Sequence, residues 1–263
     1  MTHSRSSVPG RYVRQTAFAE WGPQAQGAFE RSRALVVGVG GLGSWVSELL
    51  VRAGVGFLRL IDDDLVDLTN IHRQALYGPT DAAMRRPKVS AASDRLKGLN
   101  DACEIDVMHD RLDRFNINRL AGDVDVVVDG TDNFATRFLI NDYCVKTRRP
   151  WVFAGVVRAE AQVMTIIPGQ TACLRCVMES PPPACTDPSC REAGVLGPAV
   201  SAIASIEGLE AMKILGGRLE TISPYLLRFD LWSNTMQRIR LDGPQDDPPC
   251  PCCGLGEFEY LEP

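Results

Sequence analysis

The stretch from residue 34 to residue 53 constrains the fold more than any other part of the chain. A short apolar run, Ala34–Val39, leads into the glycine-rich turn Gly38-Val-Gly-Gly-Leu-Gly43. From Leu42 to Ala53 the apolar residues recur every three or four positions, which is typical of one face of a helix. The pattern predicts a buried strand, a tight turn and a helix, which together open a doubly wound α/β fold.

The same alternation continues along the chain. Strand-like runs occur at 57–61, 104–108, 124–128 and 151–154, and helix-like segments occur at 88–99 and 133–147. After residue 156 the pattern changes to strand-like runs at 161–167, 225–229 and 236–241, with a long helix-like segment at 198–215. We therefore expect a Rossmann-like, doubly wound and mostly parallel sheet that is extended by antiparallel strands.

Composition excludes several classes of protein. Of the 263 residues, 45% are hydrophobic and 23% are charged, which is ordinary for a globular protein. The net charge of -5 argues against a general nucleic-acid binder. We find no stretch of the roughly 20 apolar residues that a membrane span needs, and residues 1–10 lack the apolar core of a secretory signal. We expect a cytoplasmic protein whose thiols stay reduced.

The glycine turn predicts a nucleotide site. Gly38, Gly40, Gly41 and Gly43 follow the G-x-G-x-x-G pattern, in which glycines allow a tight turn and let the backbone approach a phosphate closely. Asp62 ends the next predicted strand about 20 residues after the last glycine, where an acidic residue binds ribose hydroxyls. The alternative is a glycine-rich turn that binds no ligand.

Charged residues near the same edge of the sheet favour a triphosphate. Arg73 and Lys88 follow the second predicted strand, and Asp132 directly follows the fourth. Fixed cations and a carboxylate that can hold Mg²⁺ are what phosphoryl or nucleotidyl transfer requires, which favours ATP over NAD. Two alternatives stay open: an NAD-binding oxidoreductase, or a solvated charged face that contributes nothing to a site.

The cysteines predict a metal site. Cys173 and Cys176 form one C-x-x-C pair, and Cys250 and Cys253 form another. Two such pairs can supply the four thiolates of a tetrahedral structural zinc site, and this interpretation is favoured over redox chemistry. Cys252 lies inside the second pair, so it competes with Cys253 as the fourth ligand; the C-x-x-C spacing favours Cys253.

The other cysteines divide into two groups. Cys185 and Cys190 lie in or near a proline-rich loop, and Cys190 precedes an arginine and a helix. Such a thiol can have a lowered pKa and act as a nucleophile, although an exposed non-catalytic cysteine or a metal ligand is equally compatible with the spacing. Cys103 and Cys144 are expected to be core residues. The three histidines form no recognisable catalytic or metal-binding arrangement.

Taken together, these pieces give the chain a resemblance to the ThiF/MoeB/HesA family, bacterial relatives of the ubiquitin-activating enzymes. The resemblance runs from Arg11 to about Cys253. Its matching pieces are Arg11–Gln15, Gly38–Gly43, Ala53–Gly56, Asp62, Asp64, Asn70–Gln74, Pro87-Lys88, Thr131–Asn133, Glu192–Val195 and the two cysteine pairs.

The resemblance implies an ATP-dependent adenylyltransferase. Such an enzyme converts the C-terminal glycine of a small ubiquitin-like sulfur-carrier protein ending in Gly-Gly into an acyl-adenylate and releases pyrophosphate. It implies that Asp62 holds the ribose, that Arg73 and Lys88 hold the phosphates and that Asp132 holds magnesium. By the same resemblance, Asn70 and Gln74 help to shape the site.

The resemblance also implies roles for three further features. Arg14 would reach across a symmetric homodimer to the partner's ATP; the alternative is a surface arginine. Cys190 would correspond to the family's loop cysteine, whose importance varies among members. Sulfur would come from a separate donor, a sulfurtransferase or a cysteine desulfurase.

We expect one contiguous domain with three parts. Residues 1–33 carry the dimer-crossing arginine, residues 34–168 bind ATP, and residues 169–263 form a zinc-stapled part with a crossover loop at 178–197. A third alternative stays open beside the adenylyltransferase and the oxidoreductase: a zinc-stapled scaffold that binds a ubiquitin-like protein without catalysing a reaction. The sequence leaves the carrier and its pathway open: molybdopterin, thiamin, cysteine, tRNA thiolation or secondary metabolism.

Overall fold

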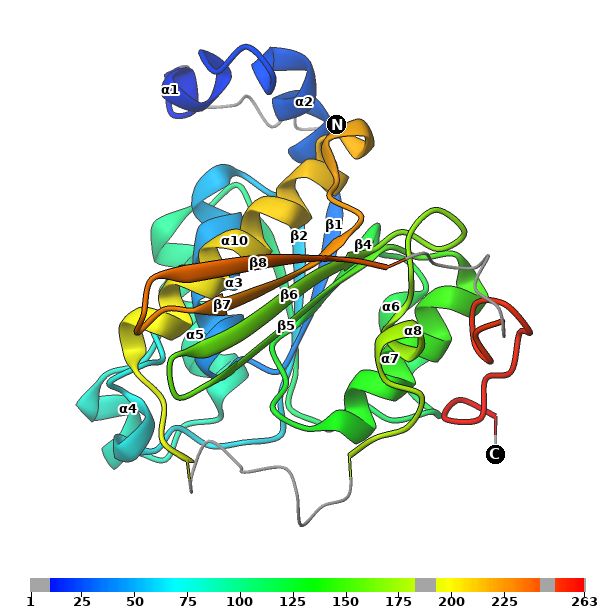
Figure 1. Ribbon diagram of the computed structural model, residues 1–263. Helices are drawn as coiled ribbons and strands as arrows, with labels where there is room; N and C mark the ends of the chain where they lie inside the picture. The colour runs from blue at the N-terminus through cyan, green and yellow to red at the C-terminus, as the bar shows by residue number, and fades with distance from the viewer. Residues whose placement is uncertain (1–9, 183–192, 242–248, 263) are drawn as a thin grey trace.

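The chain folds around one eight-stranded sheet (Figure 1). The computed structural model describes residues 10–182, 193–241 and 249–262. The strands are β1 (Arg33–Val37), β2 (Phe57–Ile61), β3 (Glu104–Met108), β4 (Val126–Asp129), β5 (Trp151–Val157), β6 (Glu160–Ile166), β7 (Tyr225–Asp230) and β8 (Thr235–Arg240). The helices are α1 (Val13–Thr16), α2 (Gly22–Phe29), α3 (Gly41–Ala53), α4 (Pro79–Ala83), α5 (Lys88–Leu99), α6 (Ile117–Ala121), α7 (Phe134–Thr147), α8 (Leu174–Val177) and α10 (Gly197–Leu215), with 3₁₀ turns η1 (Leu68–Asn70) and η2 (Leu219–Thr221).

The order of the strands confirms the predicted fold class. The sheet runs β3-β2-β1-β4-β5-β6-β7-β8. Strands β1 to β5 pair in parallel, whereas β6, β7 and β8 add to the edge as antiparallel strands. The chain leaves β1 toward β2 and β3, then returns through α6 to place β4 on the other side of β1. This reversal creates a topological switch point, where open α/β sheets bind their ligands.

Both faces of the sheet are covered around the parallel strands, whereas every residue of β8 is exposed; this covering explains the continuous apolar run of β1. Ala34 and Val36 point into a core shared with α2, α3, α5 and α10. Leu35 and Val37 point into a second core, which includes residues of α6 and α7. Figure 1 shows α3 and α10 on one side of the strands and α6 and α7 on the other. Successive side chains of one strand thus enter opposite cores.

The structure extends or shifts some predicted elements. Strand β5 continues to Val157, beyond its predicted end at Ala154, because it pairs with β6 from Trp151↔Ile166 to Val157↔Glu160. Strand β4 begins at Val126 rather than at Val124. Cys103 and Cys144 are buried, as predicted, and burial raises the pKa of the Cys144 thiol. Within the described ranges, we find no helix whose length and apolarity would suffice to cross a bilayer.

Three ionisable side chains are buried beneath the end of β4. Asp129 and Arg137 form an ion pair with 2.9 Å between Oδ2 and Nε. Glu207 of α10 is fully buried, and within the described part of the chain neither of its carboxyl oxygens has a hydrogen-bond partner of good geometry. Burial, reinforced by the charge of Asp129, raises the pKa of Glu207 well above its ordinary value. Burial therefore favours the neutral form of the Glu207 carboxyl in the folded protein.

Glu207 should make the stability of the protein depend on pH. The unfolded chain loses this proton above an ordinary glutamate pKa of about 4.3, whereas the folded chain keeps it. The raised folded pKa thus contributes stability at low pH, which is lost as the pH rises. The Glu207→Gln variant lacks this pH-dependent contribution. The free energy of unfolding of the variant minus that of wild type should therefore rise with pH, by up to about 1.4 kcal/mol per pH unit.

Urea unfolding between pH 5 and pH 8 measures this difference. Glu220→Gln provides the matched control because Glu220 is exposed, so its curve should stay parallel to that of wild type. A Glu207→Gln curve that also stays parallel would contradict a neutral, buried Glu207.

Candidate nucleotide site and cysteine cluster

A cavity of about 810 Å³ opens at the carboxyl edge of the parallel strands. Its walls come from the segments that follow β1, β2 and β4, so it lies at the switch point of the sheet. The predicted nucleotide residues that line it are Gly38, Gly40, Gly41, Asp62, Asp64, Asn70, Arg73, Gln74, Lys88 and Asp132. The fold therefore brings these residues together, although they come from separate parts of the sequence.

The glycine loop packs against backbone on two sides. Gly38 has a φ of +81°, and a Cβ on Gly43 would lie 1.9 Å from the carbonyl oxygen of Gly38. A Cβ on Gly130, at the end of β4, would lie 2.1 Å from the same oxygen. Glycine is required at these positions because no side chain fits. Gly43 thus shapes the turn without lining the cavity. Helix α3 begins beside the cavity with no side-chain cap, which leaves its first amides available for an anion.

Asp62 joins the glycine loop to the segment after β2. Its Oδ2 accepts a hydrogen bond from the backbone N–H of Val39 at 2.6 Å, and its Oδ1 accepts one from Asp64 at 2.8 Å. Burial raises the pKa of Asp62, while the nearby charge of Lys88 opposes that rise. The residue predicted to bind ribose therefore also fixes the shape of the loop.

The two predicted phosphate-binding cations occupy different surroundings. Lys88 is only 4% exposed, so it does not belong to a solvated face. Its Nζ lies 2.6 Å from Oδ2 of Asp64 and 4.0 Å from Oδ1 of Asp62. Arg73 is half-buried, and its Nη2 donates to Oδ1 of Asn70 at 2.7 Å. Both cations line the cavity.

Two further groups suit a polar ligand. Gln74 is 4% exposed, and within the described residues its Oε1 has no hydrogen-bond partner. Asp132 is exposed and lines the cavity directly after β4. The cavity thus offers donors and acceptors that fit a nucleotide with its metal ion. They are an amide oxygen without a partner, the uncapped amides of a helix, cations and an accessible carboxylate. Asp110 and Arg111 also line the cavity, which the sequence did not indicate.

Arg14 is not among the described residues that line the cavity. Arg14 is exposed on α1, at the top of Figure 1, beside the end of the sheet where β1 begins. Gln15 holds this helix there by donating to the carbonyl oxygen of Ala53 at 3.1 Å. The cavity lies at the opposite edge, so Arg14 is not part of the site in its own chain. Cys190, together with Cys185 and half of the predicted crossover loop, lies outside the described residues.

Sequence reasoning missed the buried pair that supports the segment after β4. Asp129 accepts hydrogen bonds from the backbone N–H and the hydroxyl of Thr131, at 2.9 Å and 2.6 Å. Arg137 donates to the carbonyl oxygens of Thr131 and Ala154, at 2.8 Å and 3.0 Å. One signal was available: Arg137 shares the helical spacing of Phe134 and Phe138, so a cation falls within an apolar stripe.

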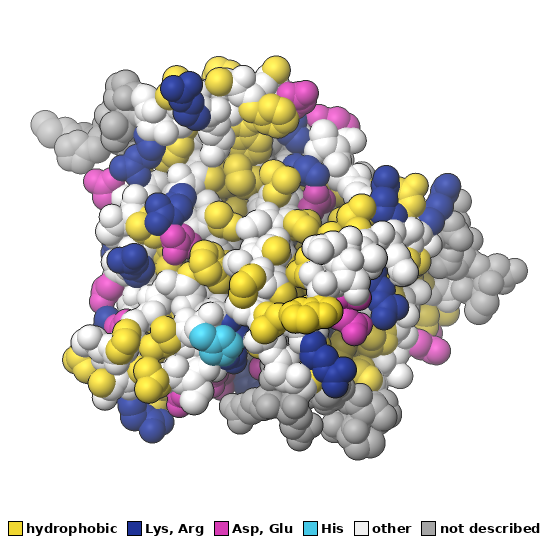
Figure 2. All heavy atoms as spheres, turned by 60° about the vertical axis from the view of Figure 1, so that its left-hand side comes forward, with side chains coloured by type: hydrophobic (Ala, Val, Ile, Leu, Met, Phe, Trp, Pro, Cys, Tyr) yellow, Lys and Arg dark blue, Asp and Glu magenta, His cyan; other side chains and the backbone are white. Residues whose placement is uncertain are grey.

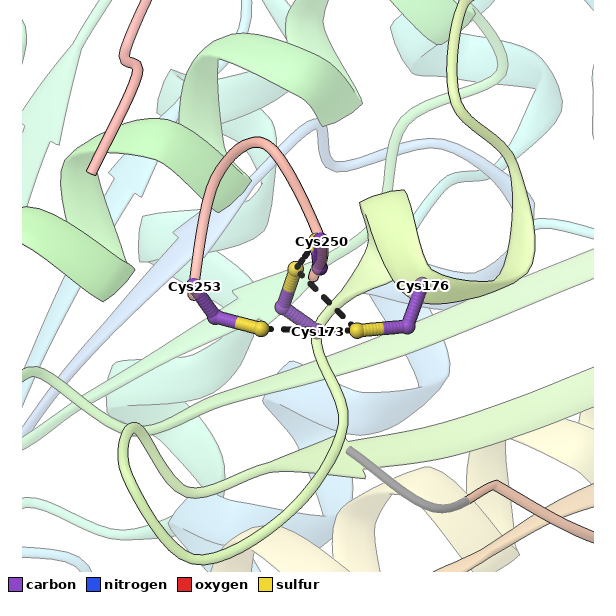
Figure 3. A group of neighbouring side chains, drawn as sticks. All are labelled: Cys173, Cys176, Cys250 and Cys253. Atoms are coloured by element: carbon purple, nitrogen blue, oxygen red, sulfur yellow. Dashed lines mark hydrogen bonds between the residues drawn. The ribbon is translucent and has the colours of Figure 1, made fainter. Parts of the chain in front are cut away.

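The four predicted metal ligands meet in one cluster (Figure 3). The sulfur–sulfur distances are 3.9 Å for Cys173–Cys176, 3.7 Å for Cys173–Cys250 and 3.4 Å for Cys176–Cys253. Sulfurs bound at about 2.3 Å to a tetrahedral zinc would lie about 3.8 Å apart. The donor set and its spacing therefore fit zinc.

Cys252 lies beside this cluster rather than within it. It is 1% exposed, and its sulfur accepts a hydrogen bond from Nδ2 of Asn141 at 3.3 Å. The same amide nitrogen lies 3.8 Å from the sulfur of Cys173. The structure thus separates the two adjacent cysteines: Cys253 faces the other three sulfurs, and Cys252 packs against α7.

The described residues on the face drawn in Figure 2 carry mixed charges. On the face drawn in Figure 2, Lys and Arg side chains are spread among acidic and hydrophobic ones instead of gathering in one basic patch. This distribution differs from the continuous basic surface typical of nucleic-acid-binding domains.

Comparison with known proteins agrees with this geometry. The ThiF family pattern matches residues 12–252. The sulfur carrier protein ThiS adenylyltransferase of Bacillus subtilis (strain 168) is 36% identical over 254 residues, which cover 97% of this chain and 74% of that protein. The adenylyltransferase and sulfurtransferase MOCS3 of Culex quinquefasciatus is 38% identical over 253 residues, 96% of this chain but only 57% of that protein.

A solved structure shows the same fold. The crystal structure of Escherichia coli MccB with ATP superposes with a TM-score of 0.76 at 20% identity, covering 93% of this chain and 74% of that one. Because the family pattern spans nearly the whole length, from residue 12 to residue 252, the chain belongs to the ThiF family.

Proposed function

We propose that this chain is an ATP-dependent adenylyltransferase that activates the C-terminal glycine of a small ubiquitin-like sulfur-carrier protein. The product is an acyl-adenylate, and pyrophosphate is released. The observation that carries the proposal is one cavity in which the glycine loop, Arg73, Lys88 and Asp132 meet. The name of the Bacillus subtilis relative, a ThiS adenylyltransferase, supports the same reaction.

The residues of the cavity take distinct roles in this reaction. The first amides of α3 and the cations Arg73 and Lys88 bind the phosphates, whose charge must be neutralised during nucleotidyl transfer. Asp62 would accept hydrogen bonds from the ribose hydroxyls, the role that an acidic residue takes at this spacing from the glycine loop. Asp132 would hold Mg²⁺, which neutralises charge on the phosphates.

The lining of the cavity extends beyond the residues that would bind the nucleotide. It continues past Gly155 over β6 and β7, where Gln162, Met164 and Leu226 line it. An extended peptide that lies along these strands would bring its terminal carboxylate toward the phosphates. This arrangement supports a protein substrate with a flexible tail ending in Gly-Gly.

Sulfur transfer would follow adenylation. The name of the Culex relative includes a sulfurtransferase, and this chain spans about half the length of that protein. We propose that a sulfurtransferase or a cysteine desulfurase donates the sulfur, and that Cys190 is a candidate nucleophile in the transfer.

The reaction can be tested by ATP–pyrophosphate exchange. Exchange should depend on a small carrier protein ending in Gly-Gly, and Asp132→Ala should lower its rate by about 100-fold, because one preorganised charge at a developing transition state contributes that much. Asp101→Ala is the matched control, since Asp101 lies on the surface outside the cavity. Absence of exchange with a panel of folded carriers would contradict the proposed function, and an unchanged rate for Asp132→Ala would contradict the magnesium role.

A second test addresses Arg14. We propose that Arg14 completes the partner's site in a symmetric homodimer, because it lies far from its own cavity. Arg14→Ala and Asp132→Ala should each have only a small residual activity alone. After subunit exchange at equal amounts, half of the dimers are mixed and each has one intact site, so about a quarter of the wild-type activity should return. A mixture that stays at this residual activity would show that Arg14 does not act across the dimer.

A third test addresses zinc. The purified protein should contain one zinc per chain, measured by mass spectrometry of the metal. Cys253→Ser should lose the metal and unfold at a lower temperature, because structural zinc contributes folding free energy directly. Cys252→Ser should keep the metal, since Cys252 stands outside the four-sulfur cluster. The reverse result, metal retained without Cys253 and lost without Cys252, would overturn this ligand set.

A further inference from the structure

We infer that Asp129 and Arg137 form a positioning pair that fixes the segment carrying Asp132. The inference rests on the proposed function, because it concerns the carboxylate that would hold the metal ion of the nucleotide. Arg137 lines the wall of the cavity, whereas Asp129 is not among the described residues that line it, and neither is assigned to contact the reacting atoms. Their role is to set where Asp132 stands.

Every polar group of Thr131 is held by the pair. Asp129 accepts from the N–H and the hydroxyl of Thr131, while Nη2 of Arg137 donates to its carbonyl oxygen. The same Nη2 also donates to the carbonyl oxygen of Ala154 in β5, which ties the segment to the neighbouring strand. Hydrogen bonds thus hold the residue just before Asp132 through its N–H, its hydroxyl and its carbonyl oxygen.

The residue just after Asp132 is fixed as well. The side chain of Asn133 caps α7 by accepting from the N–H of Thr136 at 2.9 Å. Asp132 itself is exposed, and within the described part of the chain its carboxylate makes no hydrogen bond or ion pair. Its position therefore depends on its backbone, which the two flanking residues hold.

The pair is suited to positioning more than to stability. Asp129 is fully buried and Arg137 is 6% exposed, so both lose hydration on folding. Apolar residues of similar size are often as stable as a buried ion pair. A planar guanidinium, however, places three hydrogen bonds in fixed directions, which a lysine cannot do. The rings of Phe134 and Phe153 lie 5.2 Å and 5.1 Å from its central carbon and hold the plane in place.

Two variants separate positioning from charge. Arg137→Lys keeps a cation beside Asp129 but loses the fixed geometry at Thr131 and Ala154. Thr131→Val removes only the hydroxyl that donates a hydrogen bond to Asp129, and it leaves every charge in place. Arg59→Lys is the matched control: Arg59 is a half-buried arginine that pairs with Asp106 and Asp123, and none of these residues lines the cavity.

The test measures metal binding apart from turnover. Binding of Mn²⁺ to the full chain in the presence of α,β-methylene-ATP is followed by electron paramagnetic resonance, and nucleotide affinity is measured without metal. We expect about a tenfold or greater loss of Mn²⁺ affinity in Arg137→Lys and Thr131→Val, as for other partners that orient a metal ligand. Nucleotide affinity without metal should stay within about threefold, and Arg59→Lys should match wild type in both measurements.

The outcomes decide the inference independently of the proposed function. Unchanged Mn²⁺ affinity in either folded variant would overturn the positioning role, and Thr131→Val decides the matter if Arg137→Lys does not fold. An equal loss of nucleotide affinity without metal would also overturn it, because it would indicate a general disturbance of the site. If wild type shows no pyrophosphate exchange with any carrier, the proposed function fails, while the Mn²⁺ measurements still decide the role of the pair.

Discussion

Direct contact between the backbone of the glycine loop and the backbone at the end of β4 is the constraint on which the site depends. The carbonyl oxygen of Gly38 lies so close to Gly43 and Gly130 that a Cβ on either would collide with it. Strands β1 and β4 are neighbours in the sheet but far apart in sequence. Their close approach places the first turn of α3 and the segment of Asp132 around one cavity, so amides and a carboxylate can reach the same ligand.

This backbone contact fixes the chain only as far as Gly130, just after β4. Beyond Gly130, buried polar groups hold the chain in place. Asp129 and Arg137 hold Thr131 by hydrogen bonds rather than by packing. Burial raises the pKa of the nearby Glu207, which favours its neutral form and weakens its competition with Asp129 for the guanidinium. The result is a single ion pair with defined partners in a region of low dielectric, where such bonds are strongest.

The sequence predicts the features that depend on local pattern, and it misses those that depend on contacts across the sheet. Periodicity indicated the strands and helices, and the glycine spacing indicated the nucleotide edge, because both are set by neighbouring residues. The helical spacing of Arg137 marks it as a cation within an apolar stripe, but it does not indicate the partner: Asp129 is on the preceding strand, and only folding shows that the two meet. Likewise, spacing favoured Cys253 over Cys252, but the packing of Asn141 explains the difference. The cysteine cluster and the cavity residues were thus largely predictable, whereas their supports were not.

The cysteine cluster also bears on the cavity, because the two share one piece of chain. Cys173 and Cys176 flank Leu174, and Leu174 and Val177 line the cavity. The facing segment, residues 249–262, contains no helix or strand, so side-chain contacts must hold it. Arg175 donates to the carbonyl oxygen of Glu257 at 3.0 Å, and Asp142 accepts from the N–H of Tyr260 at 3.0 Å. A metal ion bound by all four sulfurs would fix α8 between this segment and the sheet. A structural ion would thereby hold in place one wall of the cavity that we propose binds the substrate.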